Sequence, residues 1–391
     1  MRTFKTLTAA ALVIVSAAIT SSALSATDKY VGGDISLLTS YEQNGATYFQ
    51  TDGTTPISNL LEYFSDCGHN AMRLRLFHNP DNAFREAKGE GVCQSLDYIA
   101  ALGKRIKDAG MALMLDFHYS DTWADPAKQW IPAAWQGLSD DQMADSVYEY
   151  TKYALTFMVA NGATPDFIQT GNEITYGMLW DTESSAGDSN KFYAGTTDSS
   201  SPVYCRFISF LKRAGQACRE VCPNAKIIIH TERAADTTYT RNFYQIMQDE
   251  LIDYDIIGLS YYPVFHGPMS NLSDALDVID ADFPDKEVMI VEAGYHHIFY
   301  PRDADYDLTA TYPATEAGQL AFTRDLISLL LKHKAVTGLF WWWMEANDCG
   351  LDRPKQRVTH FHYNASLFDS NSGSALDAIE ELQTFLNAPS D

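Results

Sequence analysis

Residues 96–117 read LDYIAALGKRIKDAGMALMLDF, and this stretch contains the pattern that decides the fold. Apolar residues recur every three or four positions over residues 96–109, which is the spacing of a helix with one buried face. Gly110 ends this pattern. Residues 112–117 then form a nearly continuous apolar run, which is typical of a strand buried on both faces in a parallel sheet. A helix followed at once by a buried strand indicates an α/β fold.

The same alternation continues along the chain. Strands are predicted at residues 32–37, 71–77, 112–117, 167–171, 226–230, 256–260, 287–291 and 337–342. The clearest helices are predicted at residues 96–109, 142–160, 204–221 and 315–333. Eight strand-then-helix repeats, with no dividing linker, predict a single (β/α)8 TIM barrel. The alternative is an open doubly wound sheet, but no Gly-rich phosphate turn follows the first strand.

One predicted helix carries clear signals at both ends. Ser139 and Gln142 have the spacing of an N-terminal capping box. Asn161 and Gly162 form a suitable C-terminal stop. We therefore expect this helix to begin just after Ser139 and to end at residue 160.

The first residues have the layout of a targeting segment. Arg2 and Lys5 give a positive start, residues 7–19 are apolar, and small residues follow through Ala26. This order is typical of a cleaved secretory signal, and the apolar run is short for a membrane anchor of ~20 residues. We predict a signal peptide at residues 1–26 and one barrel domain at residues 27–391. The protein is then exported to the periplasm, the cell surface or the medium.

Composition and charge limit the kinds of partner. The chain has 391 residues, of which 46% are hydrophobic, and 28 Lys and Arg against 51 Asp and Glu give a net charge of −23. This content fits a packed globular core. The negative charge should repel nucleic acid and anionic lipid. We expect a neutral substrate, no nucleic acid, no membrane span and a monomer.

The cysteines have no pattern that indicates chemistry. Export permits disulfides, but six cysteines allow about 15 pairings and the sequence does not choose among them. Cys218 and Cys222, four apart on a predicted helix, would pair only with strain. No zinc spacing is present, so we interpret these residues as structural. The six are Cys67, Cys93, Cys205, Cys218, Cys222 and Cys349.

Two glutamates follow apolar strands at the predicted mouth of the barrel. Glu173 follows the fourth strand and Glu292 the seventh, and active sites in this fold lie at the C-terminal ends of the strands. The two strands lie on opposite sides of the barrel, so the carboxylates can face each other, as glycoside hydrolysis requires. The alternative is two ordinary rim carboxylates, which the neighbouring Asn172 and the strand context disfavour.

Charged side chains on the predicted strands are candidates for the same site. Arg73 and Arg75 lie two apart, so both point to one face of the second strand. If that face is the barrel interior, either arginine can reach Glu292; the alternative is an exterior ion pair. Asp116 and His118 share a face of the third strand and can orient the acid or bind hydroxyls. His230, at the end of the fifth strand, has the same two interpretations.

Aromatic residues offer platforms for a sugar ring. Trp123, Trp180 and Trp342 are candidates for stacking. Residues 341–343 are three consecutive tryptophans, so neighbours must face opposite ways and one or two belong to the core. Tyr262 ends the sixth strand and can donate its hydroxyl to Glu292, or can pack in the core.

Alternating carboxylates follow the seventh strand. Asp303, Asp305 and Asp307 can supply oxygen ligands to a calcium ion. The spacing is incomplete and lacks the Gly and Glu of an EF-hand. A solvated loop is the favoured alternative.

Several motifs together resemble glycoside hydrolase family 53, the endo-β-1,4-galactanases, also called arabinogalactan endo-β-1,4-galactosidases. The most specific is the eleven-residue run DFHYSDTWADP at residues 116–126. The resemblance covers nearly the whole mature chain. The other motifs are GDIS at 33–36, NAMRLRLFHNP at 70–80, AGM at 109–111, GNEI at 171–174, LW at 179–180, IH at 229–230, SYYP at 260–263 and VEAGY at 291–295.

The resemblance implies a retaining, endo-acting barrel enzyme that needs no cofactor for its chemistry. By motif, Glu173 corresponds to the general acid/base and Glu292 to the nucleophile, while Asn172 corresponds to the residue that holds the sugar 2-hydroxyl. Some bacterial members of the family bind a structural calcium ion. The chain departs from the family at the eighth strand, where WWWMEAN at residues 341–347 replaces the usual Trp-Glu-Pro pattern.

The leading hypothesis is therefore an exported endo-β-1,4-galactanase that degrades the galactan side chains of pectin. A first alternative is another retaining hydrolase of the same clan, such as a mannanase or a cellulase. A second is a non-catalytic surface protein that binds glycans. Such a protein would be expected to lack one of the two carboxylates, and both Glu173 and Glu292 are present.

Overall fold

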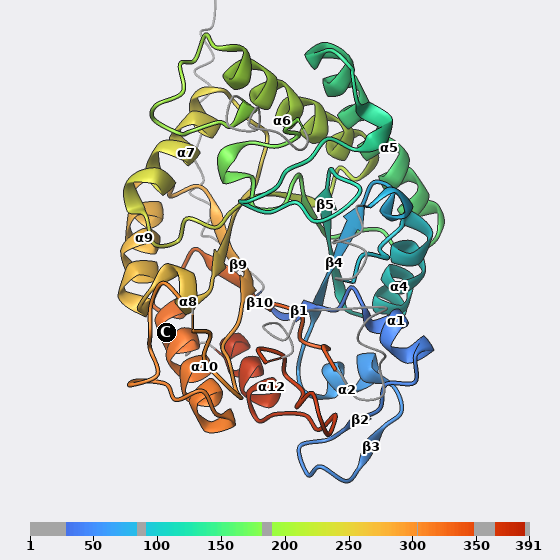
Figure 1. Ribbon diagram of the computed structural model, residues 1–391, viewed down its shortest axis with the longest axis vertical. Coiled ribbons are helices and arrows are strands. Elements are labelled where there is room, and N and C mark those ends of the chain that lie inside the picture. Colours follow the sequence, from blue (N-terminus) through green and yellow to red (C-terminus); the bar gives the residue numbers. More distant parts are fainter. Residues whose placement is uncertain (1–28, 84–90, 182–189, 303, 348–363, 388–391) are drawn as a thin grey trace, which may run out of the picture.

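Eight parallel strands close into a barrel in the computed structural model, which describes residues 29–83, 91–181, 190–302, 304–347 and 364–387 (Figure 1). The order around the barrel is β1-β10-β9-β8-β7-β6-β5-β4. The predicted TIM barrel is confirmed, and the predicted signal peptide at residues 1–26 lies outside the described residues. The strands are β1 (Tyr30–Asp34), β4 (Ala71–Phe77), β5 (Ala112–His118), β6 (Phe167–Gln169), β7 (Lys226–Thr231), β8 (Ile256–Tyr261), β9 (Glu287–Ala293) and β10 (Val336–Trp341).

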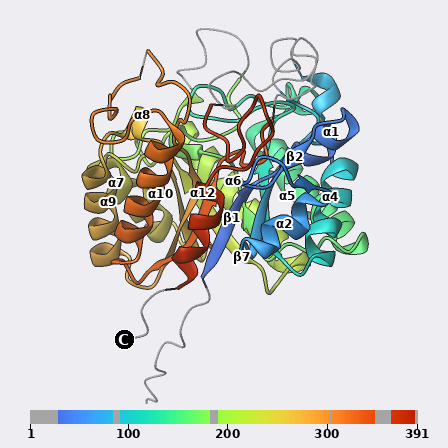
Figure 2. The ribbon, with the colours of Figure 1, turned by 90° about the horizontal axis from the view of Figure 1, so that it is seen from below.

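Helices surround the barrel on all sides (Figure 1). The short helices α1 and α8, which follow the C-terminal ends of β1 and β8, lie at the same end of the barrel (Figure 2). The α-helices are α1 (Leu38–Gln43), α2 (Leu60–Asp66), α4 (Leu96–Asp108), α5 (Asp140–Ala160), α6 (Pro202–Val221), α7 (Thr237–Asp249), α8 (Pro263–His266), α9 (Met269–Asp282), α10 (Glu316–Leu330) and α12 (Ala378–Glu381). Smaller elements are the hairpin of β2 (Tyr48–Phe49) and β3 (Pro56–Ile57) and the 3-10 turns η1 (Pro80–Asn82), η2 (Ala133–Trp135), η3 (Ile174–Tyr176) and η5 (Leu382–Leu386).

The ends of α5 are fixed as the sequence predicts. The Ser139 side chain accepts a hydrogen bond from the Gln142 N–H, and the Gln142 side chain accepts one from the Ser139 N–H. Asn161 is the C-cap residue, and Gly162 follows with φ +74°, a left-handed conformation that favours glycine. The capping box and the stop are both confirmed.

The first strand begins two residues and ends three residues earlier than predicted. Its predicted range was 32–37, but the chain turns after Asp34, where the Leu38 N–H bonds to the Ile35 carbonyl at 3.0 Å. A Cβ atom on Gly32 would lie 1.7 Å from the carbonyl oxygen of Ala71. Glycine is therefore required for β1 to approach β4 this closely.

The barrel interior is apolar at one end and polar at the other. Side chains from seven strands fill the apolar end, namely Ala71, Met114, Phe167, Ile228, Ile256, Met289, Val291 and Phe340. Because strand side chains alternate, residues two or four positions further on also point inward. These positions hold Arg73, Asp116, Gln169, His230 and Ser260, all fully buried.

A β-bulge in β9 redirects one side chain. Met289 and Val291 pack in the barrel interior, and strict alternation would turn Glu292 outward. The pairing register between β8 and β9 instead shifts, so that Leu259 pairs with Ile290 and Ser260 with Glu292. The extra residue lets both Val291 and Glu292 face inward, and Glu292 lies at the polar end.

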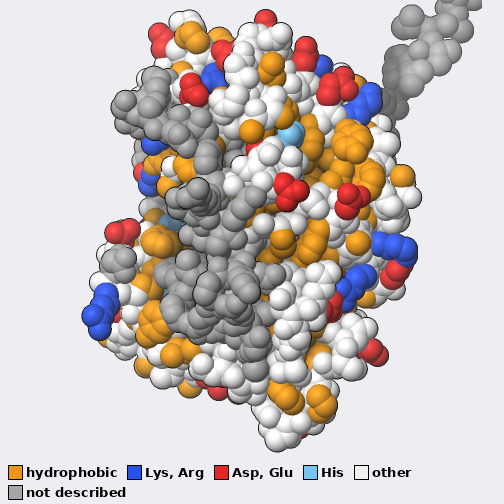
Figure 3. All heavy atoms as spheres, turned by 45° about the vertical axis from the view of Figure 1, so that its right-hand side comes forward, with side chains coloured by type: hydrophobic (Ala, Val, Ile, Leu, Met, Phe, Trp, Pro, Cys, Tyr) orange, Lys and Arg blue, Asp and Glu red, His pale blue; other side chains and the backbone are white. Residues whose placement is uncertain are grey.

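The outer surface carries both signs of charge. Figure 3 shows Asp and Glu side chains interspersed with Lys, Arg and apolar groups on one face. No helix in the described part of the chain has the length and apolar character that a bilayer crossing would need. The cysteines within that part carry free thiols, and Cys349 lies outside it.

Candidate active site

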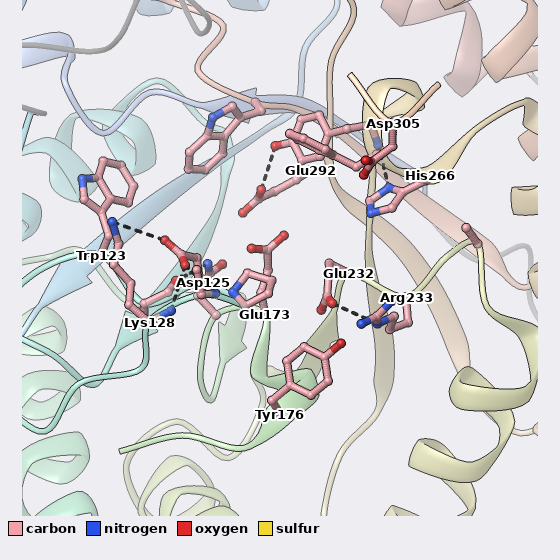
Figure 4. A pocket seen from close by; sticks show the side chains of 18 of the residues that line it. Trp123, Asp125, Lys128, Glu173, Tyr176, Glu232, Arg233, His266, Glu292 and Asp305 are labelled. Atoms are coloured by element: carbon pink, nitrogen blue, oxygen red, sulfur yellow. Dashed lines mark hydrogen bonds and ion pairs between the residues drawn. The ribbon is translucent and has the colours of Figure 1, made fainter. Parts of the chain in front are cut away.

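A cavity of about 750 Å³ opens at the C-terminal end of the barrel. Its wall comes from the segments that follow β5, β6, β7, β8, β9 and β10. Glu173 and Glu292 both point into it, and their carboxyl groups lie near each other at its centre (Figure 4). The side chains used below are Trp123, Asn172, Glu173, Tyr176, Glu232, Arg233, Tyr262, His266, Glu292, Trp342 and Trp343.

Glu173 has a backbone conformation that few residues adopt. Its φ of 46° and ψ of 51° lie in the left-handed region, which is uncommon for a residue with a side chain. The Glu173 N–H bonds to His230 Nδ1 at 3.3 Å, and Gln129 Nε2 bonds to the Asn172 carbonyl at 2.7 Å. These bonds hold the turn after β6 in a conformation that directs the carboxyl group into the cavity.

Glu292 has a cation and a hydroxyl as partners. Arg73 Nη2 lies 2.9 Å from Glu292 Oε1. The Tyr262 hydroxyl donates to Oε2 at 2.7 Å. Both contacts favour the ionised carboxylate.

Arg73 connects several buried polar side chains beneath the cavity. Its guanidinium contacts Asp34 Oδ2 at 3.0 Å, Asp116 Oδ2 at 2.8 Å and Asn172 Oδ1 at 2.8 Å. Its Nε donates to Gln169 Oε1 at 2.7 Å. The sequence left open which arginine reaches Glu292, and the structure identifies Arg73.

Arg75 occupies a different environment. Its guanidinium lies 4.5, 4.7 and 4.5 Å from the ring centres of Trp123, Trp342 and Trp343. It also lies 3.3 Å from Asp34 Oδ1. Cation–π contact of this kind fixes the three rings, so Arg75 supports the aromatic wall rather than Glu292.

A chain of hydrogen bonds connects Arg73 to Glu173. Gln169 Nε2 lies 2.9 Å from His230 Nδ1, which also accepts from the Glu173 N–H. Nδ1 is therefore the unprotonated nitrogen, and Nε2 donates to Ser260 Oγ at 2.8 Å. Ser260 Oγ in turn donates to Glu173 Oε1 at 2.8 Å.

Asp116 and His118 lie beneath the cavity. His118 Nδ1 accepts from the Ala124 N–H at 2.9 Å, so its Nε2 carries the proton and faces Asp116 Oδ2 at 2.9 Å. Both side chains are fully buried and neither lines the cavity. Their contacts support Arg73 and the loop that carries Trp123, and their binding of sugar hydroxyls stays a prediction.

Comparison with known proteins identifies the family of the chain. Residues 30–382 match the profile of glycosyl hydrolase family 53. The chain belongs to this family. It is 30% identical over 352 residues to the arabinogalactan endo-beta-1,4-galactanase of Cellvibrio japonicus, covering 86% of each chain.

Two further proteins are similar over comparable lengths. The endo-beta-1,4-galactanase of Bacillus subtilis is 29% identical over 318 residues, which are 80% of this chain and 68% of that protein. The GH53 catalytic domain of Ignisphaera aggregans superposes with a TM-score of 0.77 at 29% identity, covering 92% of this chain and 96% of the other.

The tryptophans divide between core and cavity. Trp341 is fully buried and donates from Nε1 to the Ala365 carbonyl. Trp123, Trp342 and Trp343 line the cavity, whereas Trp180 does not. Trp343 has φ 52°, and this left-handed residue breaks the strand alternation after Trp341, so Trp342 and Trp343 can both reach the cavity.

The two glutamates differ in how their protons are held. Burial raises the pKa of Glu173 well above its usual value, and the charges of Glu292 and Glu232 add to the rise. Burial also raises the pKa of Glu292, but Arg73 and Tyr262 oppose the rise and hold it at about 7. Glu173 therefore retains its proton to higher pH than Glu292.

His230 stays neutral in this setting. Burial, with Arg73 nearby, lowers the pKa of its imidazole well below the usual value. A neutral ring agrees with the proton positions derived from its hydrogen bonds.

Sequence reasoning missed several residues of the site. Glu232 lies directly after β7 and lines the cavity, and Gln169, Ser260 and Trp343 also take part. The rule that polar residues after barrel strands form the site would have found Glu232. Ser260 resembles an ordinary strand residue, and only the arrangement of β6, β7 and β8 in the closed barrel brings it to Glu173.

The acidic run that follows β9 is only partly described. Asp303 lies outside the described residues, Asp305 lines the cavity, and Asp307 accepts a hydrogen bond from the Thr309 N–H at 2.9 Å. Within the described ranges no three His, Cys, Asp or Glu side chains are grouped to hold a metal ion. Calcium binding at Asp303, Asp305 and Asp307 stays a prediction.

Proposed function

We propose that the protein is a retaining endo-β-1,4-galactanase that cleaves the galactan side chains of pectin. Membership of family 53 supports this proposal, as do relatives whose names specify β-1,4-galactan. The observation that carries it is the unequal pair of carboxyl groups in one cavity. Glu292 has Arg73 and Tyr262 as partners, while Glu173 is half-buried and accepts a hydrogen bond from the Ser260 hydroxyl.

In the first step, Glu173 gives its proton to the glycosidic oxygen as the bond from that oxygen to the anomeric carbon breaks. A Glu292 oxygen forms the new bond to the same carbon, and the leaving chain departs as an alcohol. In the second step, the ionised Glu173 takes a proton from water, which displaces Glu292. Two displacements retain the β configuration.

Neighbouring residues support these roles. Arg73 stabilises the negative charge of Glu292 before attack, and Tyr262 aims one of its oxygens. The Asn172 amide lies beside the cavity and is available to the 2-hydroxyl of the sugar, a contact that strengthens in the transition state. The proposed chemistry requires no cofactor, because the two carboxyl groups supply both the acid and the nucleophile.

The aromatic wall of Trp123 and Trp342 offers flat apolar surface to a galactose ring. Galactose has an axial 4-hydroxyl, which leaves a C–H face open for stacking. The neutral substrate also suits a protein of net charge −23. We further propose that the chain is exported and acts as a monomer.

The test is a product profile on linear β-1,4-galactan, with mannan and cellulose-type glucan tested separately as alternative substrates. We expect mixed galacto-oligosaccharides from galactan only, with the first-formed product in the β configuration by NMR. Glu173→Gln and Glu292→Gln should keep affinity for galactan but lose activity by about a thousandfold or more. Cleavage of mannan or glucan instead would indicate another clan activity, and binding without cleavage by the native protein would indicate a glycan-binding protein.

A further inference from the structure

The cavity extends to both sides of the carboxyl pair. Trp123 lies on one side of Glu173 in Figure 4, and Glu232, Arg233 and Tyr176 lie on the other. The first side carries Trp123 and, close to it, the Asp125–Lys128 ion pair, and the second carries the Glu232 carboxylate beside the Arg233 guanidinium. A polysaccharide that is cut in its interior must occupy both sides.

The side with the tryptophans suits the sugar that becomes attached to Glu292. Arg73 lies 2.9 Å from Glu292, and its guanidinium is 5.5 Å from the ring centre of Trp342. A sugar whose anomeric carbon reaches Glu292 therefore lies against the tryptophan wall. The departing part of the chain is left with the other side, next to the acid Glu173.

Glu232 dominates that second side. Its side chain is 13% exposed, and the Thr175 hydroxyl donates to its Oε2 while Arg233 Nε lies 3.2 Å from its Oε1. Arg233 is in turn held over the Tyr176 ring, 5.1 Å from its centre. These contacts fix the carboxyl group but leave further acceptor capacity on both oxygens.

On the basis of the proposed function, we infer that Glu232 binds a hydroxyl group of the galactosyl residue on the leaving-group side of the scissile bond. Glu232 is thus a substrate-binding residue of a leaving-group subsite. A fixed, mostly buried carboxyl group favours a hydroxyl in one position, so this contact selects the orientation of the departing sugar.

The titration of Glu232 agrees with this role. Burial, with a smaller contribution from Asp125, raises its pKa to about 7, against the opposing Thr175 hydrogen bond. Near neutral pH, the group can accept a hydroxyl hydrogen bond when ionised and donate one when protonated. A sugar hydroxyl, which both donates and accepts, suits either form.

Two variants separate binding of the sugar hydroxyl by Glu232 from the effect of its charge on the pKa of Glu173. Glu232→Ala and Glu232→Gln both remove the negative charge that raises the pKa of Glu173, but only Glu232→Gln keeps groups that can bond to a hydroxyl. Each is compared on galactotetraose and on 4-nitrophenyl β-1,4-galactobioside, whose aryl leaving group has no sugar hydroxyls. The pH-independent kcat/KM is the quantity measured, because removal of the charge also shifts the pH profile.

We expect Glu232→Ala to lower kcat/KM on galactotetraose by about 10- to 100-fold, because a charge-assisted hydrogen bond to the sugar is lost. Glu232→Gln should lower it by less, because its amide can still bond to the hydroxyl. On the aryl substrate both variants should stay within about twofold of the native protein. Glu220→Ala, which removes a carboxylate outside the cavity, controls for loss of charge.

Equal losses on both substrates, or equal losses for Ala and Gln, would overturn the inference, since Glu232 would then act through Glu173 alone. Unchanged activity on galactotetraose would overturn it too. Failure of the proposed function is distinguished by the native protein itself. If the native protein cleaves mannan or glucan instead, the same variants are compared on that oligosaccharide and its aryl glycoside.

Discussion

Glu173 and Glu292 carry the same side chain but have different partners. Glu292 contacts the Arg73 cation and the Tyr262 hydroxyl, and both favour its ionised form. Glu173 is half-buried near the carboxyl groups of Glu292 and Glu232, which raise its pKa, and the hydrogen bond from Ser260 opposes that rise. On the proposed mechanism, activity is lost as pH falls through the pKa of Glu292 and as pH rises through the pKa of Glu173.

Ser260→Ala tests the chain of hydrogen bonds from His230 through Ser260 to Glu173. Loss of its hydrogen bond removes a contact that lowers the pKa of Glu173, so the basic limb of kcat/KM should move to higher pH. It also leaves the buried His230 Nε2 without its acceptor, which should cost about 1–3 kcal/mol in the free energy of unfolding. The pH profile and a denaturant titration measure the two effects.

Ser146→Ala, at an exposed serine of α5, is the control and should change neither quantity by much. A basic limb that stays in place, or moves to lower pH, would contradict the role of Ser260.

The sequence identified the two glutamates because each directly follows an apolar strand. It could not identify Arg73 over Arg75, since both point inward from β4 and only the closed barrel sets which one lies beneath Glu292. The sequence did not predict Ser260 or Gln169 as site residues, because each acts through a neighbour more than 50 positions away in sequence. Ser260 bonds to Glu173, and Gln169 bonds to His230.

At the scale of elements, strong local signals predicted boundaries well and weak ones did not. The α5 helix begins and ends where its caps indicate, because capping bonds are made within the segment. The first strand begins two residues and ends three residues earlier than predicted, because its ends depend on pairing with β4 and β10. The β9 bulge that turns Glu292 inward is likewise a property of pairing.

The capping box of α5 gives an element-scale prediction. Ser139→Ala removes one of its two reciprocal bonds and should lower the free energy of unfolding by about 0.5–2 kcal/mol. Because Ser139 does not line the cavity, kcat/KM should be unchanged. A urea titration compares Ser139→Ala with Ser146→Ala in the same helix. Equal stability of the two variants would contradict a stabilising role for the capping box.

At the scale of the whole molecule, eight strand-and-helix repeats were enough to predict the barrel. Repetition along the chain is a local property, and closure follows once eight such units are present. The cavity, by contrast, takes residues from six segments between Trp123 and Trp343, so its shape depends on the assembled barrel.

The net charge of −23 leads to a whole-molecule prediction. Neutral linear galactan is not repelled, so kcat/KM on it should be independent of ionic strength. Galactan still attached to an acidic pectin backbone is repelled, and salt shortens the screening length from ~30 Å at 0.01 M to ~8 Å at 0.15 M. Its rate of hydrolysis should rise by about two- to tenfold over this range. A rate on pectin that falls with salt would contradict the prediction.

The division of roles between Glu173 and Glu292 is tested most directly by trapping the covalent intermediate. A 2-deoxy-2-fluoro-β-1,4-galactobiosyl fluoride should inactivate the protein, because the fluorine slows hydrolysis of the glycosyl-enzyme more than its formation. Peptide mapping by mass spectrometry should then place one galactobiosyl group on Glu292, and Glu292→Gln should take up none. Label on Glu173 or Glu232, or turnover to an α-configured product without any label, would contradict the assignment.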